Sequence, residues 1–338
     1  MTTPSGPISA QDIKNEFGEV SGTVPLGSYR VSQTKGELTL AIGDGVPTSG
    51  AISFDNLRNK KLNIVVDYYS GGTISRNDNG DALLNARTKY DDNNGVHVIG
   101  SLKSKPSDTS PHRVRIHVNK TIGGKKGGSN VCALRTGNFN PGTALIVEVG
   151  GEGAIYGGGG DGGEGGNTDD DGNPGQNGAS ALGIDHQGTI VNVASGGLIR
   201  CGFGGGGGGG SGRQQDKGGD RRAGGGGGGG GQGFPGGSGG DRGRGEEGAT
   251  DGTAGDLTEA GEGGGGGNHA NQAYGSPGGE GGGQGEAADA GGNAGGTTPR
   301  AGGAGGAEGS AIRKGSGVAF SLNNSGSVVG NTNQTGVS

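Results

Sequence analysis

Two acidic stretches carry residue types that could bind calcium. The stretch GGSGGDRGR, from Gly236, nearly matches the calcium-binding nonapeptide GGxGxDxUx, but its aliphatic position is Gly243 and no tandem copies follow. The stretch TDDDGNPG groups Asp169, Asp170 and Asp171, but it lacks the loop spacing and the terminal Glu of an EF-hand. We therefore predict a solvated acidic loop and no bound metal or other cofactor.

Patterns for phosphate binding and catalysis are equally weak. The stretch TIGGKKGG, from Thr121, has no glycine at the Walker spacing and no Ser or Thr after its lysines. Matches to GxGxxG occur throughout so glycine-rich a chain and follow no βαβ unit, so they carry no weight. No carboxylate pair stands at a defined spacing. The histidines, which form no visible triad with Ser and Asp, are His97, His112, His117, His186 and His269. We predict that the chain is not an enzyme.

Cys132 and Cys201 are the only cysteines of the chain. They show no CxxC spacing and no adjacent His, which argues against a zinc site. A disulfide between them stays open, but we favour two small, buried apolar side chains.

The charge pattern argues against nucleic-acid and membrane partners. The formal net charge is only -6, and acidic and basic residues are interspersed. The stretches RRAGG and DRGRG resemble RNA-binding RGG segments, but abundant Asp and Glu stand beside them. No stretch approaches the length of about 18 apolar residues that a membrane span needs, and MTTPSGPISAQ lacks the pattern of a signal peptide.

Composition limits how the chain can be stabilised. Glycine supplies 93 of 338 residues, while 26% of the chain is hydrophobic and 4% is aromatic, with no Trp. Apolar burial is what offsets chain entropy, so one conventional core cannot serve the whole length. Part of the chain must be stabilised in another way or remain disordered.

Residues 1–60 contain two similar stretches, GPISAQDIKNEFG and GAISFDNLRNK, that predict short helices. In the first, Ser9 is an expected N-cap, Asp12 lies at the third helical position, and Ile13 and Phe17 share a face. The second repeats this arrangement after Ser53. Helices this short must dock on something. They either pack on this chain's own core or serve as anchors in a larger assembly, and the sequence leaves both open.

Residues 61–149 have ordinary, strand-like composition. The stretches LNIVVDYY, GVHVIGSL, HRVRIHVNKTI and TALIVEV are β-branched or alternate apolar and polar residues, and turn-rich stretches separate them. We predict a small antiparallel β domain, sandwich-like in form. One strand should turn Val114, Ile116 and Val118 inward. Its outward residues should be Arg113, Arg115 and His117.

Residues 150–338 are dominated by glycine. GTALIVEVGGEGAIYGGGG, GTIVNVASGGLIRCGFGGGG and GVAFSLNNSGSVVGNT repeat one order: an alternating strand, a glycine turn, a short apolar segment and more glycine. We interpret these repeats as β-hairpin caps. A flexible linker is the usual reading of glycine runs, but this span is long, poor in Ser and punctuated by apolar segments.

The alternative to a linker is a bundle of polyglycine II helices. These have three residues per turn and about 3.1 Å rise per residue, and all backbone groups point outward to neighbouring helices. Only glycine permits such approach from every side. We therefore predict a mostly β chain with short N-terminal helices, a small antiparallel β domain and a glycine-rich bundle over residues 150–338. Isolated aromatics should be exposed on its loops or outer helices: Phe203, Phe234 and Tyr274. The strict Gly-X-Y period of collagen is absent.

The chain also resembles known phage proteins. GPISAQDIKNEFG and VPTSGAISFDNLR are similar to N-terminal segments of virion structural proteins of tailed bacteriophages. LNIVVDYYSGG, RVRIHVNKTIGGKKGGSNVCALRTG and GTALIVEVGGEGAIYGGGGDGGEGG continue in the style of such proteins. The glycine tracts resemble the polyglycine II bundles of phage tail-fibre adhesins. This chain departs from those adhesins in having few aromatics in its loops, which bears on how it would stack against a receptor.

The resemblance implies a tail-fibre adhesin of the virion, made in the host cytoplasm. Its N-terminal part would bind other tail or virion proteins, and distal loops would bind a host receptor, either a polysaccharide or an outer-membrane protein. The number of copies stays open between a monomer that caps another fibre and a homotrimer. The implied attachment residues are Ile8, Ile13, Phe17, Ile52, Phe54 and Leu57. The implied receptor contacts are Asp169, Asp170, Asp171, Phe203, Arg213, Arg221, Arg222, Phe234, His269 and Tyr274.

Two other interpretations remain. A purely structural virion protein, such as a head fibre, a decoration protein or a tail-tip connector, would use the bundle as a spacer and would not bind host cells. A glycine-bundle ice-binding protein would show regular Gly-x-x repeats and a flat face, which the irregular spacing and charged linkers do not give.

Overall fold

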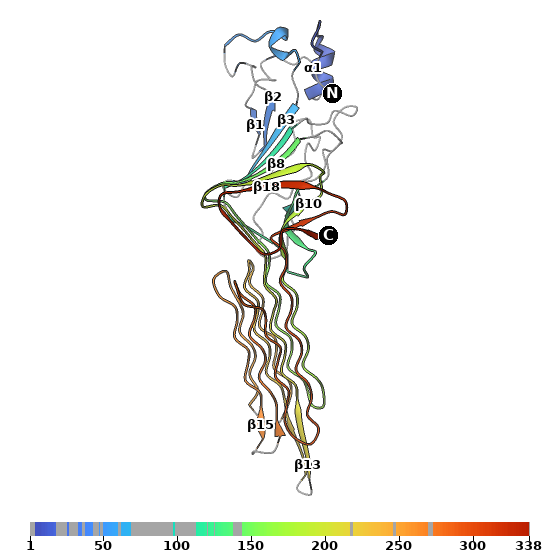
Figure 1. Ribbon diagram of the computed structural model, residues 1–338, viewed down its shortest axis with the longest axis vertical. Coiled ribbons are helices and arrows are strands. Elements are labelled where there is room, and N and C mark those ends of the chain that lie inside the picture. Colours follow the sequence, from blue (N-terminus) through green and yellow to red (C-terminus); the bar gives the residue numbers. More distant parts are fainter. Residues whose placement is uncertain are drawn as a thin grey trace.

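The protein is elongated, with the N-terminal helix at one end, a triangular β structure in the middle and long glycine-rich segments at the other end (Figure 1). The C-terminus lies at the level of the triangle. The computed structural model describes residues 4–17, 26, 33–35, 38–42, 47, 50–59, 62–68, 97–98, 113–119, 121–124, 126–137, 144–216, 219–245, 248–269 and 273–337.

Helix α1 (Ala10–Phe17) begins where the sequence predicts it. The Asp12 amide donates to Ser9 Oγ at 3.2 Å, and the Ser9 amide donates to Asp12 Oδ2 at 2.8 Å. These reciprocal bonds satisfy two amides at the start of the helix, as in a capping box. The bonds to Ser9 also hold the pKa of the Asp12 carboxyl below its ordinary value.

The second predicted helix is a single 3-10 turn, η2 (Phe54–Leu57). The Ser53 amide donates to Asn56 Oδ1 at 2.8 Å, which repeats the capping arrangement of α1. Leu57 is fully buried. Both predicted helix starts are therefore confirmed.

The middle of the molecule is a three-sided β prism. Its first side is a seven-stranded sheet in the order β1-β2-β3-β5-β8-β11-β18, antiparallel from β1 to β3 and parallel from β3 to β18. The strands of this sheet are β1 (Gln33–Lys35), β2 (Leu38–Ile42), β3 (Leu62–Tyr68), β5 (Arg113–Val118), β8 (Ala144–Val149), β11 (Thr189–Val193) and β18 (Phe320–Asn324).

The other two sides are parallel sheets in the orders β19-β12-β9-β6 and β20-β17-β10-β7-β4. The second side consists of β6 (Thr121–Gly123), β9 (Ala154–Tyr156), β12 (Leu198–Arg200) and β19 (Ser327–Val329). The third side consists of β4 (His97–Val98), β7 (Cys132–Arg135), β10 (Ser180–Ile184), β17 (Ile312–Lys314) and β20 (Gln334–Thr335).

The chain winds around the three sides of the prism in successive coils. Equivalent residues of neighbouring coils lie on top of one another. The coils β5-β6-β7, β8-β9-β10, β11-β12-β17 and β18-β19-β20 each contribute one strand to every side. On the second side, for example, Ile122, Ile155, Ile199 and Val328 occupy the same register position in four neighbouring strands. The first three are at most 1% exposed. Each coil therefore buries the apolar residues of the next.

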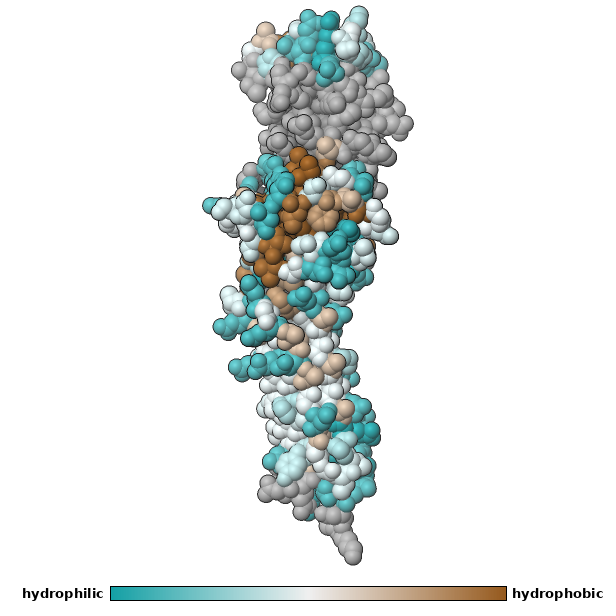
Figure 2. Space-filling view, viewed as in Figure 1, coloured by the Kyte–Doolittle hydropathy of each residue, from teal (hydrophilic) through white to brown (hydrophobic). Residues whose placement is uncertain are grey.

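None of the strands that the structure describes covers the last coil. Its strands β18, β19 and β20 are the edge strands of the three sheets. Phe320, Leu322 and Val328 of this coil are only partly buried, although they pack against the core. Figure 2 shows apolar surface gathered at the level of the prism.

The predicted antiparallel, sandwich-like domain and its hairpin caps are wrong. Within each sequence repeat, the two apolar stretches lie in different sheets, as β8 and β9 do, and each pairs in parallel with the equivalent strand of the next repeat. The Gly150–Gly153 turn is a corner of a coil, closed by a Gly153 N–H to Gly150 O bond of 2.9 Å. The expected division at residue 149 falls inside the second coil, because β10 and the later strands continue the same sheets.

The predicted faces of strand β5 are borne out where its side chains are described. Ile116 and Val118 are fully buried, and His117 faces outward and lies 2.9 Å from Glu148 of β8. Val114, Arg113 and Arg115 have side chains outside the described part of the structure.

The glycine-rich segments are two excursions from one corner of the prism. Residues 157–179 leave after β9 and return to β10, and residues 201–311 leave after β12 and return to β17. Both excursions begin where the chain passes from the second side of the prism to the third. The long excursion contains two short antiparallel hairpins, which Figure 1 shows far from the prism. They are β13 (Gly212–Asp216) with β14 (Gly219–Ala223), and β15 (Asn268–His269) with β16 (Ala273–Tyr274).

The two pure glycine runs occupy the interior of this assembly. Within Gly204–Gly210, successive amides donate to three different neighbours in turn: Gly205 to Gln176, Gly206 to Gly229, and Gly207 to Asp289. The cycle then repeats, at Gly208, Gly209 and Gly210. Carbonyls of the run accept from three further segments. The six neighbouring segments are 163–166, 173–176, 226–229, 276–282, 289–292 and 303–306.

Outer segments carry a side chain at about every third residue. In the segment from Ala301 onward, Ala301, Ala304 and Ala307 are exposed, while the glycines between them face other segments. A repeat of three residues thus places these three alanines on one face of the segment. The pure runs lack such positions because they have neighbours on all sides.

Contacts at the corner fix the glycine segments to the prism. Lys126, in the loop between β6 and β7, donates to Asp161 Oδ1 and to Ser238 Oγ, each at 3.0 Å. The Ser238 amide donates to the same Asp161 oxygen at 2.7 Å. The Gly124 amide donates to Phe234 O at 3.0 Å. One prism loop therefore joins segments from both excursions.

Replacing an interior glycine tests this packing. A Cβ on Gly207 would lie 1.9 Å from the Gly303 carbonyl oxygen, so Gly207→Ala must push two backbone segments apart. We expect its free energy of unfolding to fall by about 1–3 kcal/mol or more, as for other overpacked interiors. Thermal and denaturant unfolding monitored by circular dichroism would measure this.

The control is Gly265→Ala, in an outer segment of the same region. Its Cβ would meet only Thr250 Oγ1, at 3.6 Å, which is ordinary contact. We expect a change within about 0.5 kcal/mol. Equal stability of the two variants would contradict the close packing of the interior run.

Candidate functional site

The end of the glycine segments that lies away from the prism gathers five separate parts of the chain. Hairpin β13–β14 contacts both β15 and β16. The turn at 167–170 joins this hairpin through Asp169, and the stretches 243–245 and 295–300 lie beside it. We call these five parts the distal tip. Figure 1 shows β13 and β15 at this end.

Charged side chains tie the distal tip together. Arg213 Nη1 lies 2.8 Å from Asp169 Oδ2, and Arg213 Nε lies 2.7 Å from Asp220 Oδ1. Arg222 Nη2 lies 2.8 Å from the second oxygen of Asp220. Hydrogen bonds from Arg213, and then from Arg222, hold the pKa of the Asp220 carboxyl below its ordinary value. The network orders the β13–β14 hairpin against a turn 44 residues earlier.

Backbone bonds add the remaining parts. The Thr297 amide donates to Arg213 O at 2.9 Å, and the Gln215 amide donates to Thr297 Oγ1 at 3.1 Å. The Gly295 amide donates to Tyr274 O at 3.0 Å. The Tyr274 side chain is 39% exposed, which makes it one of the most exposed large apolar groups among the described residues.

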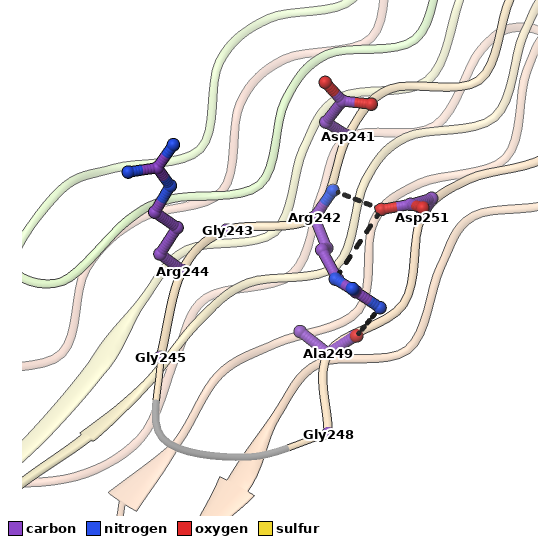
Figure 3. A pocket seen from close by; sticks show the side chains of 8 residues that line it. All are labelled: Asp241, Arg242, Gly243, Arg244, Gly245, Gly248, Ala249 and Asp251. Atoms are coloured by element: carbon purple, nitrogen blue, oxygen red, sulfur yellow. Dashed lines mark hydrogen bonds and ion pairs between the residues drawn. The ribbon is translucent and has the colours of Figure 1, made fainter.

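An open hollow of about 590 Å³ lies on the side of the distal tip. Its lining includes Asp241, Arg242, Arg244 and Asp251 (Figure 3). The Arg242 amide donates to Asp251 Oδ1 at 2.9 Å, and its side chain reaches Ala249 O at 3.4 Å. Figure 3 shows the Arg244 side chain pointing away from this group. Arg244 is also exposed.

The structure brings most predicted receptor residues together. At the distal tip lie Asp169, Asp170, Asp171, Arg213, Arg221, Arg222, His269 and Tyr274. Asp171 has a structural role as well, because its Oδ1 accepts from the Ala301 amide at 2.9 Å. Asp170 O accepts a hydrogen bond of 2.8 Å from Ser211 Oγ.

Two predicted aromatics are elsewhere, so their expected exposure is wrong. Phe203 is 3% exposed and lies just after β12, where its segment leaves the prism. Phe234 is half-buried at the same end, and its ring meets Tyr156 edge-on at 6.4 Å between centroids. Both pack at the junction with the prism because large apolar rings gain most by leaving water. Both rings therefore lie away from the distal tip.

Several tip residues were missed from the sequence. Arg242 and Arg244 lie in GGSGGDRGR, which was weighed for calcium and RNA binding but not for receptor contact, and Asp251 and Thr297 lie in linkers between glycine-rich stretches. For Arg242 and Arg244 the sequence signal is the alternation of charged residues with glycine in DRGRG. This alternation does not show which linkers lie at the same end of the molecule.

The predicted attachment residues mostly pack on one another. Ile13 is 1% exposed and Leu57 is fully buried, with Ile8 and Ile52 packed beside the core. Phe54 is 39% exposed. The Phe17 side chain lies outside the described part of the structure. The buried residues thus pack in the chain's own core, whereas Phe54 faces outward.

Other chemistry is limited in the described ranges. Cys132 and Cys201 are buried free thiols, and burial raises the pKa of each to about 12. Among the described residues, no three or more His, Cys, Asp or Glu side chains are grouped to hold a metal ion. No helix in the described ranges is long and apolar enough to span a membrane.

Comparison with known proteins identifies relatives of this chain. A protein-family model described as "Phage tail fibre adhesin Gp38" matches residues 85–333. None of the curated proteins matches closely enough to count as a relative. Among solved structures, a similar chain belongs to "Crystal structure of the gp37-gp38 adhesin tip complex of the bacteriophage S16 long tail fiber". The similarity covers 65% of this chain and 71% of that chain, with 21% identity and a TM-score of 0.28.

Titration of Asp220 tests the tip network. Its lowered pKa means that the network's stabilisation is present above the ordinary Asp pKa and is lost as the pH falls through the lowered value. We expect carboxyl ¹³C NMR to show Asp220 titrating below the ordinary range of about 3.9. In Arg213→Gln its pKa should rise. In Arg244→Gln, which leaves the network intact, it should not change. An ordinary pKa in the unmodified protein would contradict the network.

Proposed function

Because this chain belongs to the phage tail fibre adhesin family Gp38, we propose that it attaches a virion to its host through the distal tip. The observation that carries this proposal is the convergence of five chain segments, rich in Arg and Asp, at the end of a long scaffold. Loops held by a rigid scaffold lose little freedom on binding, and several copies on a virion would add avidity. The role is binding, and the family is not an enzyme family.

We propose further that the scaffold is a bundle of polyglycine II helices. Support comes from the cycle of three amides that donate to three neighbours and from the outward side chain at about every third residue. Both follow from three residues per turn. The charge and side chains of the distal turns can then vary while the interior glycine contacts stay the same.

The opposite end of the molecule is proposed to bind other tail proteins. Residues 1–60 supply Phe54, whose ring is exposed beside the buried Leu57. In the middle of the molecule, the last coil of the prism offers a second surface of this kind, with edge strands and partly exposed apolar residues. Exposed apolar surface of this kind marks protein contacts more often than free surface. The chain would thus reside in the virion after synthesis in the host cytoplasm.

Cell binding by purified protein tests the tip assignment. We expect fluorescently labelled protein to bind cells of the phage's host, and Tyr274→Ser combined with Arg244→Ser to weaken binding at least about tenfold, since central aromatic and Arg contacts dominate interfaces. Phe54→Ser is the matched control. Its side chain is as exposed as that of Tyr274, at 39%, but it lies at the other end. This variant should bind cells normally.

Two outcomes would count against the proposal. If the unmodified protein does not bind host cells, the alternative of a purely structural virion protein gains support. If Phe54→Ser abolishes binding while the tip variant binds normally, the contact surface lies at the other end of the chain.

A further inference from the structure

A second hollow lies at the prism end of the glycine segments, away from the distal tip. Its volume is about 690 Å³. Tyr156 and Arg200, which end strands β9 and β12, line it together with two turns of the long excursion, 256–259 and 283–286. We call it the junction hollow.

Both turns that border the junction hollow are held in place. Asp256 Oδ1 accepts from the Thr258 and Glu259 amides at 2.6 and 2.8 Å, and Gly283 and Glu286 exchange two backbone bonds of 3.0 Å. Buried Gln232 joins the two turns. Its Nε2 donates to Leu257 O at 3.1 Å, and its Oε1 accepts from the Gln284 amide at 3.1 Å. The lining is therefore formed before any ligand arrives.

Arg200 is a buried cation of this lining. It is 8% exposed, and its guanidinium carbon lies 4.8 Å from the centroid of the Tyr156 ring. Nη2 donates to Leu257 O, but Nε has no hydrogen-bond partner among the described residues. A guanidinium has five N–H donors, and a buried donor without a partner costs free energy. Arg200 lines the hollow, so donors of its guanidinium other than the enclosed Nε are the ones that can meet acceptor atoms of a bound molecule.

The outer lining has the opposite charge. Four exposed carboxylates surround the opening, and Arg200 is the one cation among the lining residues that the structure describes. They are Glu259, Glu262, Glu280 and Glu286. Carboxylates accept hydrogen bonds and attract cations, and they repel phosphate, sulfate and uronate groups. They are not grouped closely enough for a metal ion.

We propose that the junction hollow binds an amino saccharide. Ring hydroxyl oxygens accept from the Arg200 guanidinium, while hydroxyl groups and protonated amino groups donate to the four carboxylates. A saccharide supplies acceptors and donors on one small scaffold, which matches a cationic floor within an anionic opening. This site goes beyond the adhesion proposed for the distal tip and does not depend on it.

Calorimetric titration of the full-length protein tests the proposal, with the tetramer of β-1,4-linked glucosamine as the probe. We expect binding with a Kd below about 1 mM. The variant Glu259→Gln/Glu262→Gln/Glu280→Gln keeps the shape of the lining and removes three charges. It should bind about tenfold more weakly, since each exposed charge pair contributes modestly. Binding should also weaken as salt rises, because these carboxylates are exposed.

Two comparisons make the result decisive. Asp289→Asn removes an exposed carboxylate of the same glycine segments outside the hollow and should bind like the unmodified protein. The tetramers of N-acetylglucosamine and of galacturonate should bind more weakly or not at all. Absence of binding by the glucosamine tetramer, equal binding by the triple variant, or equal binding by galacturonate would each overturn the proposal. None of these results tests host-cell binding through the distal tip, so the two proposals can fail separately.

Discussion

The architecture depends on hydrogen bonds between backbones that no side chain separates. In Gly205–Gly210 each amide donates to a neighbouring segment, and successive amides turn to different neighbours. Ordering glycine costs more chain entropy than ordering any other residue, and each net hydrogen bond returns only about 0.5–1.5 kcal/mol. A single such segment cannot be stable. Six neighbours around each interior run make the arrangement cooperative.

The β prism supplies what the glycine segments lack, namely apolar burial. Aliphatic residues such as Ile122, Ile155 and Ile199 stack from coil to coil and hold the corner from which both excursions leave and to which both return. Fixing the ends of a long loop lowers the entropy that its interior bonds must offset. Buried Phe203 and half-buried Phe234 extend the apolar contact at this corner into the glycine segments.

Local features could be predicted from sequence, whereas long-range pairing could not. Ser9 and Asp12 mark a helix start through bonds three residues apart, and the alternation of Ile116 and Val118 marks a buried strand face. Apolar and polar residues alternate with a period of two in parallel and antiparallel sheets alike. This alternation therefore does not distinguish the coils of the prism from hairpins. The contact of Arg213 with Asp169 depends on the order in which segments stack, which composition does not encode. The exposure of Phe203 was misjudged for the same reason.

The central claim is that the pure glycine runs are an ordered interior and not a tether. Hydrogen–deuterium exchange of the intact protein, read by mass spectrometry on peptides covering Gly204–Gly210 and Gly224–Gly231, tests it most directly. Every amide of these runs that has a partner in a neighbouring segment should be protected to a degree comparable with the prism strands, because opening one bond requires neighbouring segments to separate. Complete exchange within seconds in both runs, with the prism still protected, would contradict the account.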